Sequence, residues 1–148
     1  MNEQDNNKNA LLHASVAHNH VKIFKILIAE GANVDAKDDN GSTPIHEASY
    51  YGHQDVVKAL IDAGVNVDEK NILGNTPLHE ASYYGHQNVV KALIEAGANV
   101  NEKDNYGNTP LSGGTIQGHT DIFRILIESG ADLDAKDNYG KTPLNCAA

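Results

Sequence analysis

Histidine is the residue type that most suggests a chemical site, because the 148 residues contain eight histidines. Imidazole is a common metal ligand and a general acid or base near neutral pH. His13, His18 and His20 are near enough in sequence to approach one another, but no cysteine or acidic residue at zinc-like spacing accompanies them. The spacing therefore favours structural histidines, and we expect neither a metal nor a cofactor.

A calcium loop and a catalytic site are the other kinds of chemistry to weigh. Four places of a calcium-binding loop are filled, by Asp38, Asn40, Gly41 and Glu47. However, Ala36 stands at the first ligand position and Pro44 falls inside the loop. The sequence contains no Ser or Cys nucleophile motif, no phosphate-binding glycine loop and no HExxH helix. We therefore expect no enzymatic activity and no small-molecule substrate.

Charge and cysteine content limit the partners and the compartment. Eleven Lys and Arg against 20 Asp and Glu give a net charge of −9, which opposes binding to nucleic acid or to an anionic membrane. The longest apolar stretch, near Ile23 to Ala29, is interrupted by Lys25 and is too short to cross a bilayer. The lone Cys146 and the lack of a signal-peptide pattern favour the cytosol or nucleus, or a host cytosol if the chain is a secreted effector.

A repeat of 33 residues sets the elements that position these side chains. One tetrad recurs at this interval, as Thr43-Pro44-Ile45-His46, Thr76-Pro77-Leu78-His79, Thr109-Pro110-Leu111-Ser112 and Thr142-Pro143-Leu144-Asn145, with a degenerate copy at Ala10-Leu11-Leu12-His13. Residues 41–73 and 74–106 are identical at 24 of 33 positions. The similarity indicates a recent duplication or a designed array.

The pattern of each unit predicts two helices and a loop. Thr43 can cap the first helix and Pro44 suits its first turn, while Gly52 ends it. Aliphatic residues at helical spacing follow, up to Gly64, and the turn residues 68–74 predict a hairpin. One unit alone buries too few side chains to fold, so stability must come from stacking neighbours.

These motifs carry a family resemblance, because the chain resembles an ankyrin-repeat protein over nearly its whole length. The resemblance implies an all-α repeat solenoid, with antiparallel helix pairs linked by β-hairpin loops, and a noncatalytic role in binding a partner protein. It also implies that seven histidines hydrogen-bond within and between units, namely His13, His20, His46, His53, His79, His86 and His119. We expect a single domain over residues 1–148, with units at about 5–37 (cap-like), 38–70, 71–103, 104–136 and 137–148 (incomplete).

The aromatic residues are sorted within the repeat. Phe24 and Phe123 share one position in the second helix, among aliphatic residues expected in the core. The tyrosines lie elsewhere, at Tyr50, Tyr51, Tyr83 and Tyr84 at the ends of first helices, and at Tyr106 and Tyr139 in the hairpins. The resemblance places these positions on the concave face and the finger tips, and tyrosine is frequent at binding hot spots.

Three aliphatic residues extend the predicted partner-binding set. Ile72 and Leu73 stand at a hairpin tip where other units have polar residues or tyrosine, and Ile116 takes the place of Tyr50 and Tyr83. Apolar side chains at a solvated tip are costly unless something covers them. The alternatives are that the tyrosines merely pack between adjacent first helices, and that the array is a purely structural or engineered scaffold without a dedicated partner.

Four further features are open in the sequence. The lysines Lys37, Lys70, Lys103 and Lys136 recur every 33 residues and either attract an acidic partner or balance nearby Asp. Asn101 lies in a pattern that resembles the target of an asparaginyl hydroxylase. Gly113 and Gly114 should soften their helix. The last unit stops at Ala148, so we expect its open end to be continued by further chain, or covered by a partner or a second copy.

Overall fold

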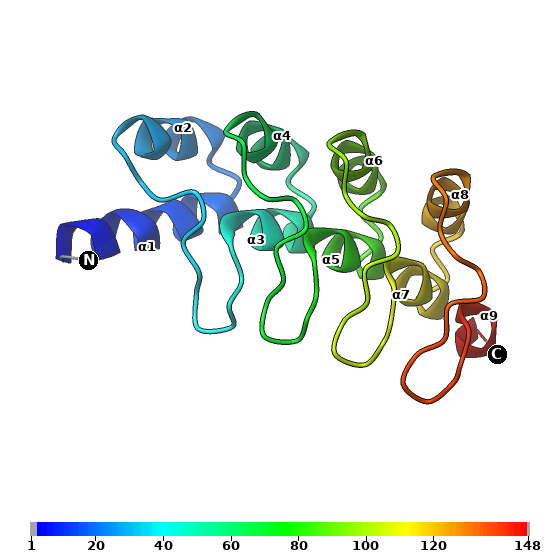
Figure 1. Ribbon diagram of the computed structural model, residues 1–148. Coiled ribbons are helices and arrows are strands. Elements are labelled where there is room, and N and C mark those ends of the chain that lie inside the picture. Colours follow the sequence, from blue (N-terminus) through cyan, green and yellow to red (C-terminus); the bar gives the residue numbers. More distant parts are fainter. Residues whose placement is uncertain (1–2, 148) are drawn as a thin grey trace.

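The computed structural model describes residues 3–147, which form two rows of short helices with loops projecting from one side, as Figure 1 shows. The inner row consists of α1 (Glu3–Ala17), α3 (Pro44–Tyr51), α5 (Pro77–Tyr83), α7 (Pro110–Ile116) and α9 (Pro143–Ala147). The outer row consists of α2 (Val21–Ala29), α4 (Gln54–Asp62), α6 (Gln87–Glu95) and α8 (Thr120–Glu128). Each inner helix packs against the next, so the array grows in one direction.

The inner helices begin where the sequence predicts. Thr43 adopts an extended conformation before α3, and Pro44 takes the first helical position, where no backbone N–H is needed. His46 completes the cap, because its Nδ1 accepts the Thr43 N–H at 3.1 Å. The same arrangement starts α5 at Thr76, with His79 in the place of His46.

Glycine ends the inner helix for a steric as well as a conformational reason. Gly52 has a φ of 75°, in the left-handed region that glycine adopts without strain. A Cβ there would also collide with the imidazole of His86 in the next unit. That imidazole Nε2 lies 2.8 Å from the carbonyl oxygen of Tyr50, so the same close approach ties one unit to its neighbour.

The connecting loops, which we name fingers, contain no strand anywhere in residues 3–147, although β-hairpins were expected. A side-chain oxygen organises each finger instead. In the first, Asp38 Oδ1 accepts the N–H groups of Asn40 and Ser42, both at 2.9 Å. A backbone bond also closes each finger, as Asp38 N–H donates to Ser42 O at 2.9 Å, and further bonds join successive fingers, such as Ile72 N–H to Asn40 O at 3.0 Å. The fingers are thus hairpin-like turns without strands, linked from unit to unit.

The core is a continuous layer between the two rows. Ile45, Leu78 and Leu111 occupy one repeat position and are almost wholly buried between successive units. Phe24 is buried, whereas Phe123 is half-buried and packs at the edge of the core. Leu144, at the same repeat position as Leu111, is 67% exposed because no further unit packs on α9 in this structure. No helix within the described part of the chain is long and apolar enough to cross a membrane.

Candidate functional site

A groove of about 690 Å³ runs along the inner face of the array. Its floor is formed by α3, α5 and α7, and its wall is formed by the fingers that Figure 1 shows projecting beside these helices. Seven of the predicted partner-binding residues line it, namely Tyr50, Tyr51, Ile72, Leu73, Tyr83, Tyr84 and Ile116. The groove therefore collects residues from three units into one surface.

Four tyrosines form a continuous cluster on the groove floor, which we name the tyrosine cluster: Tyr50, Tyr51, Tyr83 and Tyr84. The rings of Tyr50 and Tyr84 lie 4.5 Å apart, centroid to centroid, edge to face across two units. Burial raises the pKa of Tyr84 to about 12, with a smaller effect from the Tyr50 hydroxyl. The rings pack between units, as one interpretation expected, yet each remains more than 40% exposed, so the cluster also presents apolar area to a ligand.

Ile72 and Leu73 stand on the finger wall with their backbone already fixed. Ile72 N–H donates to Asn40 O at 3.0 Å, and Leu73 O accepts the N–H of Asn105 at 2.9 Å. The side chains are nevertheless 63% and 48% exposed. A partner that covers them has little backbone entropy left to remove, which favours binding.

Tyr106 and Tyr139 do not join this site. Both lie in later fingers and are exposed, but neither lines the groove. Their backbone N–H groups are held by Asp104 and Asp137, each at 2.9 Å, so the turns position the rings at the finger tips. Tyr106 belongs to the third unit that builds the groove and Tyr139 to the unit after it, but both side chains lie outside the groove lining.

The groove also contains carboxylates that the sequence analysis did not select. Glu47 and Glu80 are equivalent residues on α3 and α5, and Asp38 and Asp104 lie in the fingers beside them. No lysine or arginine lines the groove in the described residues. Helical spacing could have identified Glu80, because Tyr83 and Tyr84 follow it by three and four residues and so share its face.

The two glutamates differ in their partners. Glu47 Oε2 lies 3.3 Å from Nδ1 of His13, and this contact is the largest cause of the raised pKa of His13. Glu80 lies beside the Asn71 amide, whose Nδ2 is 3.4 Å from its Oε1, and no cationic side chain of the described residues pairs with it. Burial raises the pKa of Glu80.

Six of the seven histidines expected to hydrogen-bond have Nε2 within 3.1 Å of a backbone carbonyl oxygen, namely His13, His46, His53, His79, His86 and His119. His20 contacts the ring of His18 instead. The Nε2 atoms of His46 and His79 lie 2.9 Å from the carbonyl oxygens of Asn75 and Asn108, one finger further on. Burial is the largest cause of the lowered pKa of both side chains. These histidines are neutral structural links rather than groups free to act on a ligand.

The first histidines do not converge on a common centre. His13 is directed to Glu47 and to the Ala36 carbonyl oxygen at 3.0 Å, while the rings of His18 and His20 lie 5.9 Å apart. Within residues 3–147, no three His, Cys, Asp or Glu side chains are grouped so that they could hold a metal ion.

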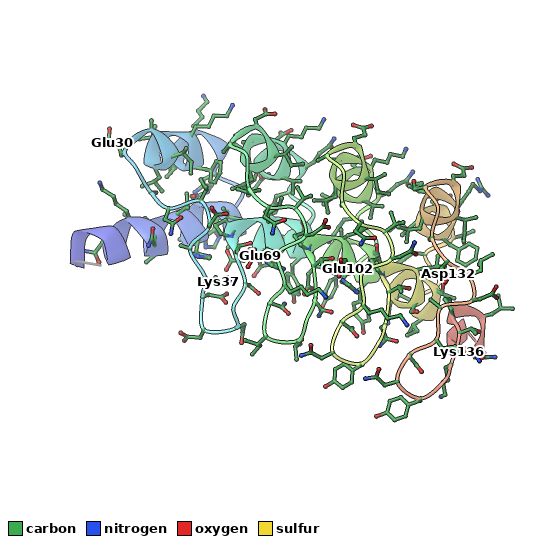
Figure 2. All side chains as sticks on the ribbon, in the orientation of Figure 1. Glu30, Lys37, Glu69, Glu102, Asp132 and Lys136 are labelled. Atoms are coloured by element: carbon green, nitrogen blue, oxygen red, sulfur yellow. The ribbon has the colours of Figure 1, made fainter. Side chains whose placement is uncertain are left out.

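Three of the four lysines that recur every 33 residues, Lys37, Lys70 and Lys103, make side-chain contacts within the array. Figure 2 labels Lys37 together with Glu69 and Glu102 on the fingers that carry them. Lys37 Nζ lies 2.8 Å from Glu69, and Lys70 Nζ lies 2.9 Å from Glu102. Lys103 Nζ donates to Lys136 O at 2.9 Å. These contacts favour the interpretation that the lysines balance neighbouring acids, so they give no reason to expect an acidic partner.

Asn101 links two units through its side chain. Its Oδ1 accepts the N–H of Asp132 at 2.8 Å, and its Nδ2 donates to Gly130 O at 3.2 Å. Asp68 accepts the Asn99 N–H at 3.0 Å in the equivalent place. Asn101 thus has a structural role, and its hydroxylation stays a prediction.

Comparison with known proteins agrees with this geometry. The family model for ankyrin repeats, in three copies, matches residues 1–71 and again residues 64–137. A search of curated proteins found no match.

Proposed function

Because the chain belongs to the ankyrin-repeat family, whose domains generally bind proteins and are typically noncatalytic, we propose that this array is a noncatalytic recognition module that grips a partner protein in the groove of α3, α5 and α7. The observation that carries the proposal is the exposed apolar set on a preformed surface. Ile72 and Leu73 line the same groove as the tyrosine cluster, and backbone hydrogen bonds join their finger to the fingers on either side. We also propose that the array is a single domain whose units begin and end where the 33-residue repeat predicts.

The chemistry of the lining suits recognition better than catalysis. Tyrosine offers a large ring and a polar tip with few rotatable bonds, which is the character of binding hot spots. The buried histidines are engaged with backbone carbonyls, so they do not offer a free base beside a nucleophile.

Capture from cell lysate followed by mass spectrometry tests this proposal. The unaltered chain is compared with a groove variant that carries Tyr51→Ala, Tyr84→Ala, Ile72→Ser and Leu73→Ser. All four side chains are more than 40% exposed, so we expect the variant to fold with little loss of stability. A partner that is recovered with the unaltered chain and lost from the groove variant supports the proposal.

The matched control removes exposed apolar area elsewhere. Leu11→Ser, Ile23→Ser and Ile26→Ser alter side chains of α1 and α2 that are 49 to 61% exposed and lie outside the groove lining. We expect the control to retain the partner. Loss from the control and retention by the groove variant would place binding at the other end of the array.

The alternative is that the array is a purely structural or engineered scaffold. It predicts that the groove variant changes only solubility, with identical recoveries from lysate.

Three secondary proposals are testable by the same comparison with the residue or face altered. They are binding by Tyr106 and Tyr139 at the finger tips, modification of Asn101, and a partner or second copy on the open face of α9.

A further inference from the structure

One carboxylate of the groove lacks a counter-charge, for a reason that can be traced in the sequence. In α3 and α5, Thr43 and Thr76 occupy the Nδ1 atoms of His46 and His79. In the first unit the equivalent residue, Ala10, has no hydroxyl and lies inside α1 rather than before a helix, so it does not cap His13 as the threonines do. The Nδ1 of His13 is therefore available to Glu47 on the next helix, at 3.3 Å.

The next unit keeps its threonine, Thr43, so Glu80 has no histidine partner of this kind. His46 would be its counterpart of His13, but its Nδ1 already accepts from Thr43 at 3.1 Å. Glu80 is left with the Asn71 and Asn75 amides in a half-buried position. A partly desolvated carboxylate without a cation gains more from a ligand cation than a solvated carboxylate does.

The space for such a ligand is present beside Glu80. Gly113 is the equivalent residue on α7, and it lines the groove without a side chain. A Cβ there would make an ordinary contact with Tyr83 at 3.7 Å, so the lining has room for added atoms at this position. Glu80, Tyr83 and Gly113 thus bound a recess next to the rings of Tyr50 and Tyr84, which we name the Glu80 recess. A carboxylate beside aromatic rings is a favourable environment for a cationic side chain.

We propose that the Glu80 recess takes a lysine or arginine side chain of the partner, from a segment whose neighbouring apolar residue packs on Ile72 and Leu73. Charge complementarity supports this occupant, because the lining contains Asp38, Glu47, Glu80 and Asp104 but no lysine or arginine in the described chain. The inference rests on the proposed function, since it names the partner chemistry of the same groove.

A phage-displayed library of random dodecapeptides tests the inference on the intact chain. The library is selected against the unaltered protein, Glu80→Gln, Glu95→Gln and the groove variant. Glu95 ends α6 outside the groove lining, so its substitution removes the same charge from a different surface. We expect the unaltered protein and Glu95→Gln to enrich peptides with Lys or Arg next to an apolar residue.

The selected peptides are then synthesised and their affinities measured by calorimetry. We expect Glu80→Gln to bind these peptides on the order of tenfold or more weakly, as removal of a charge-assisted contact implies. When norleucine replaces the basic residue of the peptide, we expect Glu80→Gln to recover part of the lost affinity. Enriched peptides without a basic residue, or equal affinity for Glu80→Gln, would overturn this inference and leave the proposed groove intact. Peptides that bind the unaltered protein and the groove variant equally would contradict both.

Discussion

At the scale of the residue, the partners of His46 and His79 hold both imidazoles neutral. The Nδ1 atom of His79 accepts the Thr76 N–H at 3.1 Å, so the proton stays on Nε2, which faces the Asn108 carbonyl oxygen. Protonation of Nδ1 would remove the acceptor, in agreement with the lowered pKa that burial causes. The neutral form is therefore tied to the folded state.

This tie predicts how stability depends on pH. A histidine whose pKa is lower in the folded state than its usual 6.5 binds fewer protons there, so its contribution is lost as the pH falls through that value. His13 has a raised pKa and acts in the opposite direction, so a difference between variants isolates His79. Asn145 stands at the repeat position of His79, and its Oδ1 accepts the Thr142 N–H at 3.2 Å. Asparagine is therefore the substitution that keeps this acceptor.

We expect His79→Asn to cost about 1 kcal/mol at pH 7.5, from the lost Nε2 hydrogen bond, and less at pH 5.5. Urea unfolding at the two pH values measures this difference. A cost that stays the same or grows on acidification would show that His79 is not held neutral.

A second prediction at this scale separates the two groove glutamates. Glu80→Gln removes a half-buried charge that lacks a cation, so we expect the free energy of unfolding at pH 7 to rise by about 0.5 kcal/mol. Glu47→Gln breaks the contact with His13, so we expect it to fall by about 0.5 kcal/mol. Denaturant titration measures both, and equal effects would contradict the difference in their partners.

At the scale of the element, α7 differs from its neighbours in its two glycines. Each helical glycine costs about 1 kcal/mol relative to alanine, and Gly113 and Gly114 replace Glu-Ala of α5. A Cβ at Gly113 would meet Tyr83 at 3.7 Å, an ordinary contact, whereas one at Gly114 would lie 3.3 Å from Cγ2 of Ile122. Gly113 is thus the position where alanine fits without displacement.

We therefore expect the amides of residues 110–116 to exchange faster than those of 77–83. Gly113→Ala should stabilise the array by about 1 kcal/mol, and Gly114→Ala by less, because Ile122 must yield. Hydrogen exchange with mass spectrometry measures the first, and thermal unfolding measures the second. Equal protection of the two helices would disprove the softness of α7.

The elements were largely predictable from the sequence, and the partners of the side chains were not. Thr43, Pro44 and Gly52 act through local geometry, which recurs with the repeat, so they mark helix α3 correctly. The difference between Glu47 and Glu80 depends on Ala10, which lies more than 30 residues away in sequence, and only the packing of α1 on α3 brings its consequence to the groove. The fingers turn back as expected of hairpins but form no strands in residues 3–147, because Asp38 Oδ1 takes the N–H groups of Asn40 and Ser42 and one backbone bond, Asp38 N–H to Ser42 O, closes the turn.

At the scale of the whole molecule, stability comes from the contact between neighbouring units. Leu111 and Leu144 make this visible, since they hold the same repeat position and are 0% and 67% exposed. We expect Leu111→Ala to cost about 2 to 5 kcal/mol, as for a buried leucine, and Leu144→Ala less than about 0.5 kcal/mol. Urea unfolding of the two variants measures the difference, and similar costs would argue against stacking as the source of stability.

The arrangement of units also creates the groove, because its tyrosines, aliphatic residues and carboxylates come from three consecutive units. The central claim is that a partner protein lies in this groove. A photo-crosslinking amino acid at Tyr84, inside the groove, and another at Lys91, on the exposed side of α6, test it in cell lysate. The account predicts a crosslinked partner from position 84 and none from position 91. Crosslinks of equal yield at the two positions, or at position 91 alone, would contradict it.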